Sequence, residues 1–190
     1  ALLLTERSVL GLPQRMRASK LWLPCIGLLL STVPSFAQHV HGEAQAQVGI
    51  SGREVEITIA VPSADVVGFE YEPRTPEERE LVAAAVIDLL DQRDRLVTIR
   101  MRRRGTVALV DAEIVQPHGD HDDHDHQDGH SEFEVDLLFE VSDPNAIRDL
   151  SIAGFFEALP SVSEVDWVVL GSQGQSAGEA TPRRHRITLP

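Results

Sequence analysis

Cysteine and aromatic residues are scarce in this sequence. Its 190 residues include one cysteine, two tryptophans, one tyrosine and six phenylalanines. The cysteine, Cys25, lies in an apolar stretch near the N-terminus, so no thiol follows it. A disulfide, a cysteine-ligated zinc site and a redox-active thiol pair each need at least two cysteines. The scarcity therefore excludes zinc-finger and thiol-redox functions for the rest of the chain.

Long apolar runs are also missing. The longest candidate, residues 21–30, is shorter than the roughly 20 residues that a membrane-spanning helix needs, and a proline and a glycine interrupt it. It has the three parts of a secretory signal instead: Met16, Arg17 and Lys20 before the apolar run, and Ser35, Phe36 and Ala37 after it. The pattern predicts a cleaved signal peptide over 16–37 and export from the cytoplasm. Residues 1–15 precede the first methionine and stay unassigned.

The remaining chain, residues 38–190, is strongly acidic. Four basic residues and one acidic residue precede position 38, which leaves 13 Lys+Arg against 29 Asp+Glu and a net charge of −16. This charge argues against a nucleic-acid partner. An acidic surface attracts cations, although acidic surfaces also serve solubility. The 153 residues suffice for one domain, which would bury roughly 68–70% of the unfolded chain's surface.

Alternating apolar and polar residues predict several strands in this domain. The clearest alternations cover residues 40–50, 55–61, 108–114 and 133–141, and shorter strands are expected at 165–170 and 186–189. The turn signal at Ser51 and Gly52 joins the first two strands in a hairpin. Residues 63–74 are expected to be irregular, and a Gly/Ser/Gln turn is expected after 170.

One long helix is predicted between these strands. Thr75, Pro76 and Glu78 supply a cap, a first-turn proline and the partner of a capping box. Leu81, Val82, Ala85, Val86, Leu89 and Leu90 recur at helical spacing, which predicts a helix that packs on the sheet and ends near Arg95. A short helix is expected at 152–159. The fold class is therefore α+β, with a mainly antiparallel β-sheet or sandwich and one long and one short helix.

A histidine-rich and aspartate-rich loop, residues 117–131, is the most specific feature of the sequence. Five histidines and five aspartates occur within 118–130, and the loop has no apolar residue. Imidazole nitrogens suit zinc, copper and nickel, and carboxylate oxygens can complete a zinc shell without sulfur. The candidate ligands in the loop are His118, His121, His124, His126, His130, Asp120, Asp122 and Asp125. Such interchangeable ligands favour metal capture over catalysis, which needs fixed ligands on a rigid frame.

Two other interpretations of the loop are disfavoured. A solvated low-complexity loop would explain the aspartates, but it has no need of five imidazoles that are mostly neutral near pH 7. Calcium is disfavoured because the EF-hand spacing fails: with Gly129 at the sixth position, the twelfth is Val135 instead of glutamate.

A second group of histidines lies at the start of the mature chain. If the strand at 40–50 includes them, His39, His41 and Glu43 point to the same face and could chelate one ion. His185 stands among three arginines, whose charge opposes metal binding, and is therefore left out.

Several segments resemble the ZrgA family of zinc-uptake proteins. They are residues 39–44, which read His-Val-His-Gly-Glu-Ala, residues 68–73 before the long helix, the histidine-rich loop, and residues 155–160 near the C-terminus. The resemblance covers residues 39–189. It implies a periplasmic zinc-binding protein of Gram-negative bacteria that is expressed under zinc shortage and assists zinc import, alongside a zinc transporter or its solute-binding protein.

The sequence departs from the family pattern in two places. Tyr71 stands where the resemblance implies a histidine, so no ligand role carries over to it. Glu70 and Glu72 could still offer oxygen ligands there, but simple surface carboxylates are the favoured interpretation of both. A cysteine pair found in many relatives is also absent. We predict a protein that binds zinc, with other late first-row divalent metals as alternatives, and assists its uptake. The alternative is a periplasmic buffer or resistance protein for zinc, nickel or copper. A zinc hydrolase is disfavoured because no catalytic motif occurs.

Overall fold

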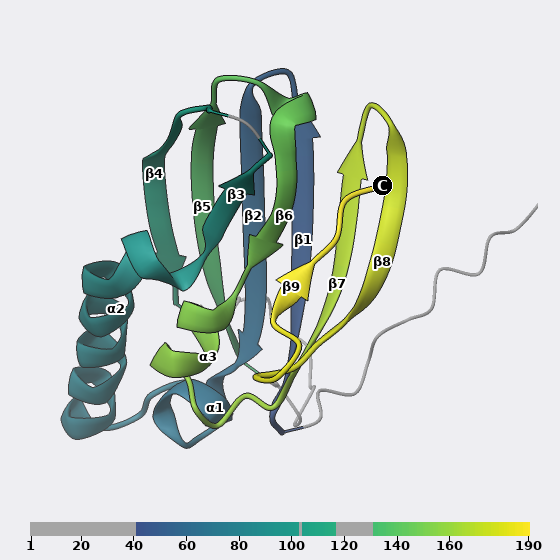
Figure 1. The fold of residues 1–190 in the computed structure, drawn as a ribbon. Coiled ribbons are helices and arrows are strands. Elements are labelled where there is room, and N and C mark those ends of the chain that lie inside the picture. The colour runs from purple at the N-terminus through teal and green to yellow at the C-terminus, as the bar shows by residue number, and fades with distance from the viewer. Residues whose placement is uncertain (1–40, 103, 117–130) are drawn as a thin grey trace, which may run out of the picture. The chain divides into compact units, whose positions relative to one another are not determined.

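Most of the alternating segments form one six-stranded sheet, with strand order β4-β5-β2-β1-β7-β8 (Figure 1). The strands, in chain order, are β1 (Glu43–Ser51), β2 (Glu54–Pro62), β4 (Val107–Val115), β5 (Glu132–Val141), β7 (Glu164–Gly171) and β8 (Gly174–Ala180). Neighbouring strands run antiparallel except β1 and β7, which are parallel. The hairpin of β1 and β2 and the mainly antiparallel sheet are thus confirmed.

This computed structural model describes residues 41–102, 104–116 and 131–190. The described residues belong to one compact unit, Phe36–Pro190. The predicted signal peptide at 16–37, the extension at 1–15, His39 and the loop residues 117–130 lie outside the described residues.

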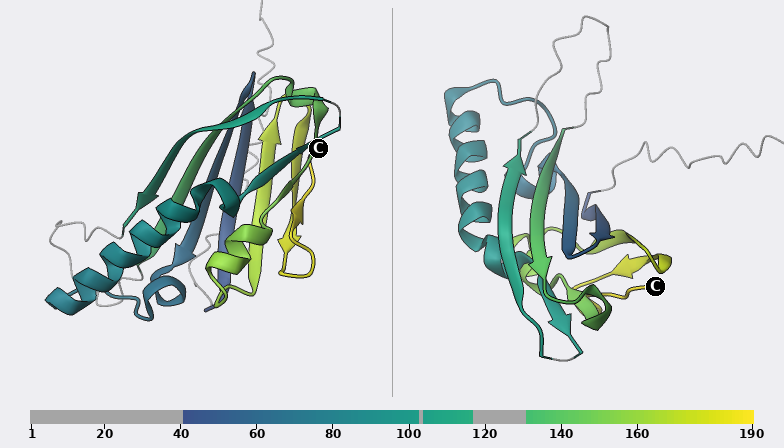
Figure 2. Two further views of the ribbon diagram at one scale, coloured as in Figure 1. Left: turned by 60° about the vertical axis from the view of Figure 1, so that its left-hand side comes forward. Right: turned by 90° about the horizontal axis from the view of Figure 1, so that it is seen from above.

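A second, three-stranded sheet lies across one face of the first (Figures 1 and 2). Its strands are β3 (Thr98–Met101), β6 (Ile147–Ser151) and β9 (Arg186–Ile187), in the order β3-β6-β9. A single turn of 3₁₀ helix, Pro144–Ala146, precedes β6. The sequence predicted neither β3 nor β6, and β9 is shorter than the strand expected at 186–189. The α+β fold class is confirmed, and its sheets form a sandwich.

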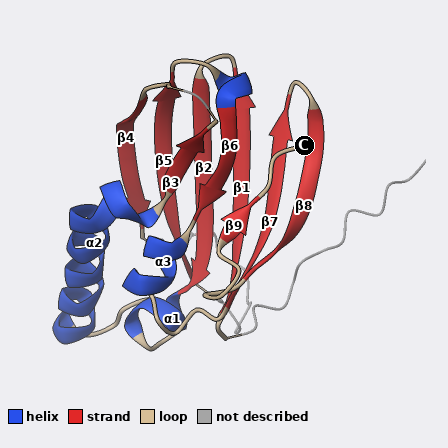
Figure 3. Ribbon diagram, viewed as in Figure 1, coloured by secondary structure: helices blue, strands red, loops and turns tan. Residues whose placement is uncertain are grey.

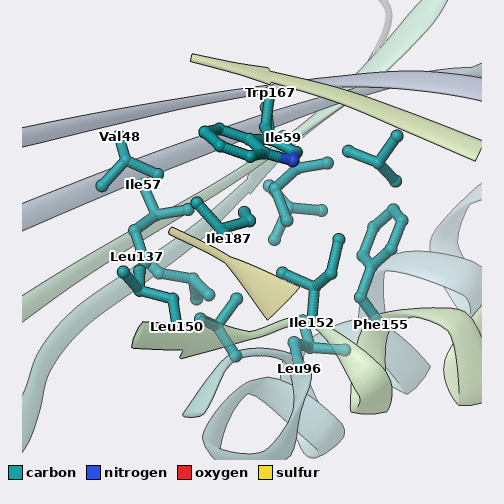
Figure 4. Close-up of a cluster of buried hydrophobic side chains, with 14 of the residues drawn as sticks. Val48, Ile57, Ile59, Leu96, Leu137, Leu150, Ile152, Phe155, Trp167 and Ile187 are labelled. Atoms are coloured by element: carbon teal, nitrogen blue, oxygen red, sulfur yellow. The ribbon is translucent and has the colours of Figure 1, made fainter. Parts of the chain in front are cut away.

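The hydrophobic core lies between the two sheets (Figure 4). Ile57 and Leu137 reach it from the large sheet, and Leu150 and Ile187 reach it from the second sheet. All four side chains are at most 1% exposed. The alternation that predicted the strands therefore also predicted the buried residues of β1, β2 and β5. In β4 it was wrong: the register shifts between Leu109 and Asp111, so Leu109 packs on the core and Val110 is 52% exposed.

Three helices complete the fold: α1 (Ser63–Val67), α2 (Pro76–Leu96) and α3 (Ala153–Ala158) (Figure 3). The predicted capping box of α2 is present: Thr75 Oγ accepts from the Glu78 N–H at 3.1 Å, and the Glu78 carboxylate accepts from the Thr75 N–H at 2.9 Å. Gly154 allows α3 to approach α2, because a Cβ there would collide with the Arg95 carbonyl oxygen.

Four local predictions were wrong. The first strand begins at Glu43 instead of residue 40, because Gly42 has a φ of 84° and interrupts the extended backbone. The segment 63–74 contains α1, and the expected turn is followed by the strand β8, which the sequence did not predict. On α2, Val82 and Leu89 are buried and Val86 and Leu90 pack on the core as predicted, but Leu81 is 55% exposed.

Candidate metal-binding end of the large sheet

Several strand ends meet at one end of the large sheet. Glu43 of β1 pairs with Glu164 of β7, and Pro62 of β2 pairs with Glu132 of β5. Because β4 and β5 are antiparallel, the end of β4 lies beside the start of β5. The residues that flank the loop 117–130 and the residue His41 are therefore neighbours at this end, although about 75 residues of chain separate them. We call this end, with His41, Asp65, Glu70 and Ser131, the histidine end.

Gly42 fixes the backbone beside His41. Its N–H donates to the Asp65 carboxylate of α1 at 2.8 Å, and its carbonyl accepts from the N–H groups of Ser163 at 2.8 Å and Glu164 at 3.1 Å. A Cβ on Gly42 would lie 3.1 Å from Ser163 Oγ, and its φ favours glycine. The histidine thus sits in a turn that is tied to both α1 and β7.

Glu70 fixes the base of the loop. Its carbonyl oxygen accepts from the backbone N–H of Ser131 at 3.1 Å and from the Ser131 hydroxyl at 2.8 Å. The carbonyl of Ser131 accepts in turn from the N–H of Ser63 at 2.8 Å. Ser131, immediately before β5, is therefore tied to the segment of Ser63 and Glu70, which is far away in the sequence.

The side chain of Glu70 also reaches His41. Glu70 Oε1 lies 3.5 Å from His41 Nδ1, and the two side chains are 27% and 71% exposed. A carboxylate on one ring nitrogen of a histidine orients the ring and leaves the other nitrogen, here Nε2, as the one that can bind a metal. The pairing of His41 with Glu70 replaces the predicted pairing of His41 with Glu43 on one strand face, which fails because His41 precedes the strand.

Tyr71 points away from this cluster. Its hydroxyl donates to Glu78 at 3.0 Å, its ring stacks on Phe69 with centroids 5.0 Å apart, and the Arg74 guanidinium lies 4.9 Å from its centroid. The hydrogen bond to Glu78 raises the pKa of the Tyr71 phenol. A neutral phenol directed at the start of α2 cannot serve as the ligand that the resemblance places at this position.

Carboxylates crowd the large sheet next to the histidine end. Burial raises the pKa of the Glu164 carboxyl, and the neighbouring carboxylates of Glu179, Asp166 and Glu43 raise it further. Like charges on adjacent strands repel, so this part of the sheet carries negative potential that a cation would relieve.

The described residues alone do not make a complete metal site. Within 41–102, 104–116 and 131–190, no three His, Cys, Asp or Glu side chains lie close enough to hold an ion together. His41 and Glu70 supply one nitrogen and one oxygen of the kinds that zinc accepts. Of the ten predicted ligands, His41 is the one that lies in the described part; the other nine lie outside it.

Comparison with known proteins decides the family. The sequence matches the model of the ZrgA family, described as zinc uptake proteins, over residues 38–189. The chain belongs to the ZrgA family. No curated protein matches it. Membership in the ZrgA family makes zinc uptake the general role of the chain and zinc the associated metal.

The ZrgA match covers the two histidine groups and everything described between and after them. Sequence reasoning identified both groups but could not see that Glu70, Asp65 and Ser131 join the described residues that flank them. No local pattern marks these three residues, since contacts such as Gly42 with Asp65 and Ser131 with Glu70 join segments 23 and 61 positions apart. Among the described residues, no helix is both long and apolar enough to span a membrane.

Proposed function

We propose that the protein captures zinc in the periplasm and presents it to a zinc transporter or to the solute-binding protein of that transporter. The proposed ligands are His39 and His41 at the start of the domain and, in the loop, His118, His121, His124, His126, His130, Asp120, Asp122 and Asp125. The periplasmic location rests on the signal sequence predicted at 16–37.

The link from His41 through Glu70 to Ser131 carries the proposal: the His41 ring lies 3.5 Å from the Glu70 carboxylate, and the Glu70 carbonyl accepts hydrogen bonds from Ser131. Ser131 directly follows the histidine-rich stretch, and Glu70 contacts both Ser131 and His41. The described residues that flank the two ligand groups therefore meet at one end of the sheet, which supports one shared ion instead of two independent ones. We assign Glu70 the role of a positioning residue that orients His41 through Nδ1.

The ligand chemistry suits capture and release. Zinc accepts four nitrogen or oxygen ligands in a tetrahedral arrangement, and the loop offers many equivalent sets. Exchange between equivalent sets keeps zinc exchangeable, whereas a rigid, closed site of fixed ligands would retain it. The neighbouring carboxylates of Glu43, Glu164, Asp166 and Glu179 add a negative field that favours the approach of a divalent cation.

Uptake is favoured over metal resistance because the family is described by zinc uptake. Catalysis is not part of the proposal. His41 and Glu70 form a carboxylate–histidine pair, but no helix carries the two spaced histidines and glutamate of a zinc protease.

A double-mutant cycle tests the shared ion. Zinc would be titrated by calorimetry into the mature protein, into His41→Ala, into a variant with all five loop histidines changed to asparagine, and into their combination. We expect a loss of affinity of about 100-fold for the loop variant and about tenfold for His41→Ala, comparable to the loss of key metal contacts. The combined variant should bind no more weakly than the loop variant, because contacting groups are not additive.

Two results would contradict the proposal. Unchanged affinity in the loop variant would remove the loop from the site. Additive losses with two zinc ions per chain would show that the two histidine groups bind separately.

A further inference from the structure

The outward face of the second sheet is rich in arginine. Arg100 of β3 pairs with Asp149 of β6, and Arg186 of β9 pairs with Ser151 of β6. The alternating residues Ile99, Leu150 and Ile187 are buried in the core, at 7%, 0% and 0% exposure, so the arginines project outward. Arg102, which directly follows β3, is exposed, and Arg148 is exposed at the bulge of β6. We call Arg100, Arg102, Arg148 and Arg186 the arginine face.

One buried carboxylate arranges two of these arginines. Asp149 Oδ1 lies 3.7 Å from Arg100 Nη1, and Asp149 Oδ2 lies 3.4 Å from Arg148 Nε. The Asp149 side chain is 8% exposed, and its Oδ1 has no hydrogen bond to the described residues. The arginines remain accessible, with side-chain exposures of 35% for Arg100 and 58% for Arg148. Asp149 therefore holds the guanidinium groups of Arg100 and Arg148 side by side. Its single negative charge lies among the four positive charges of the arginine face.

The acidic residues of the large sheet lie on the far side of the sandwich. Glu54, Glu56, Asp136, Asp166 and Glu179 alternate with buried core residues and therefore face away from the second sheet. Stacked sheets are about 10 Å apart, and the Debye length is about 8 Å at physiological ionic strength. The acidic face is thus screened from anything that contacts the arginine face, in spite of the net negative charge of the chain.

We propose that the arginine face docks on the phosphate headgroups of an anionic membrane surface. Guanidinium groups match phosphate oxygens with two parallel hydrogen bonds, and clusters of four or more basic residues favour acidic lipids. Protein interfaces have an apolar centre. The exposed large apolar side chains of the described residues lie on other elements, at Tyr71, Leu81, Ile87, Val110 and Leu170. The face therefore fits a lipid surface better than a protein partner.

This inference shares only the export step with the proposed function and needs no zinc. Docking by this face would hold the protein at the membrane where import takes place, with the acidic face turned to the solvent. A membrane-bound position shortens the path from captured zinc to a transporter.

Vesicle sedimentation tests the docking surface. The mature protein would be mixed, with a chelator present, with vesicles of phosphatidylglycerol and phosphatidylcholine or of phosphatidylcholine alone. We expect binding to the anionic vesicles that weakens with added salt, and none to the neutral ones. Arg100→Gln, Arg148→Gln and Arg186→Gln combined should lower the partition coefficient about 100-fold. The same three changes to lysine should retain most of the binding, and circular dichroism would show that both variants are folded.

The matched control removes the same charge from helix α2, with Arg79→Gln, Arg93→Gln and Arg95→Gln. The partition coefficient of this control should stay within about threefold of that of the unmodified protein, since the changed arginines lie on another element. An equal loss in this control, or no binding of the unmodified protein at low salt, would overturn the proposal. Binding to soluble polyglutamate without binding to vesicles would also overturn it, in favour of an acidic protein. Zinc titration of the same variants distinguishes a failure of membrane docking from a failure of zinc capture.

Discussion

The histidine end and the core between the sheets are held together in opposite ways. The core joins apolar side chains, such as Ile57, Leu137 and Leu150, that the alternation of each strand directs inward. The histidine end is held by polar contacts of Asp65, Glu70 and Ser131 that join distant segments near the surface. The difference predicts that stability and the proposed zinc binding depend on separate sets of residues. A change in one region should therefore leave the other region unaffected.

The largest effect is expected from the core. Leu150→Ala removes a fully buried side chain from the second sheet and should lower the free energy of unfolding by about 2–5 kcal/mol, because the cavity fills only partly. Urea denaturation would measure the loss. Zinc affinity of the folded variant, measured at low temperature, should stay within about twofold of the parent, and a large change in affinity would break the separation of the two regions.

The pH dependence of zinc binding is expected to be the next largest effect. A protonated imidazole cannot bind zinc, and free histidine titrates near pH 6.5. Between about pH 7.5 and 5.5 the affinity should therefore fall about 100-fold if two histidines bind the ion. Calorimetry at the two pH values measures this, and equal affinities would argue against histidine ligands. The unfolding midpoint over the same range serves as the control for the core.

Glu70→Gln should weaken zinc binding about tenfold, because the amide keeps the size of the side chain but loses the charge that orients His41. Glu72→Gln is the matched control: it removes the same charge two residues away, from a side chain outside the contacts of His41 and Ser131. Competition with a fluorescent zinc indicator would compare them. If the two changes weaken zinc binding equally, Glu70 acts only through the general surface charge and does not position His41.

The smallest effect is expected at Glu164. Burial and three neighbouring carboxylates raise the pKa of its carboxyl group, so ionised Glu164 costs stability in the folded state. That cost is present above the raised pKa and disappears as the pH falls below the ordinary value of 4.5. Glu164→Gln should therefore stabilise the apo protein at neutral pH by about 0.2–1 kcal/mol, and the gain should vanish in acid.

Thermal unfolding at several pH values would measure the gain from Glu164→Gln. Glu140→Gln is the comparison on the same sheet, because Glu140 pairs with Arg53 at 3.1 Å and its neutralisation should give no stabilisation. A gain of the same size from both changes would attribute the effect to net charge instead of the crowded carboxylates.

Much of the large sheet could be predicted because the residues of β1, β2 and β5 alternate between core and solvent. The exceptions have physical causes. Strand β8 has no alternation because Gly178 must stay small: a Cβ there would lie 2.6 Å from the Trp167 ring. Strand β6 combines a bulge with the buried Asp149, which hides its period. Strand β3 has four residues, too few for a pattern.

The candidate site was predicted in part for similar reasons. Histidine density identifies the candidate ligand groups from composition alone. The meeting of their described flanking residues at one end depends on the pairing of β1 with β7 and of β4 with β5, which no local pattern encodes. The assignment of His41 and Glu43 to one strand face failed at a single glycine, Gly42, whose backbone lies in the left-handed region.

Retention of zinc by the purified mature protein is the most direct test of the account. The protein, without its leader and without an affinity tag, would be dialysed to equilibrium at pH 7.5 against zinc at about micromolar concentration, beside the variant that lacks all five loop histidines. We expect the protein to retain zinc and the variant to retain little. A protein that retains no zinc, or a variant that retains as much as its parent, would contradict capture by these histidines.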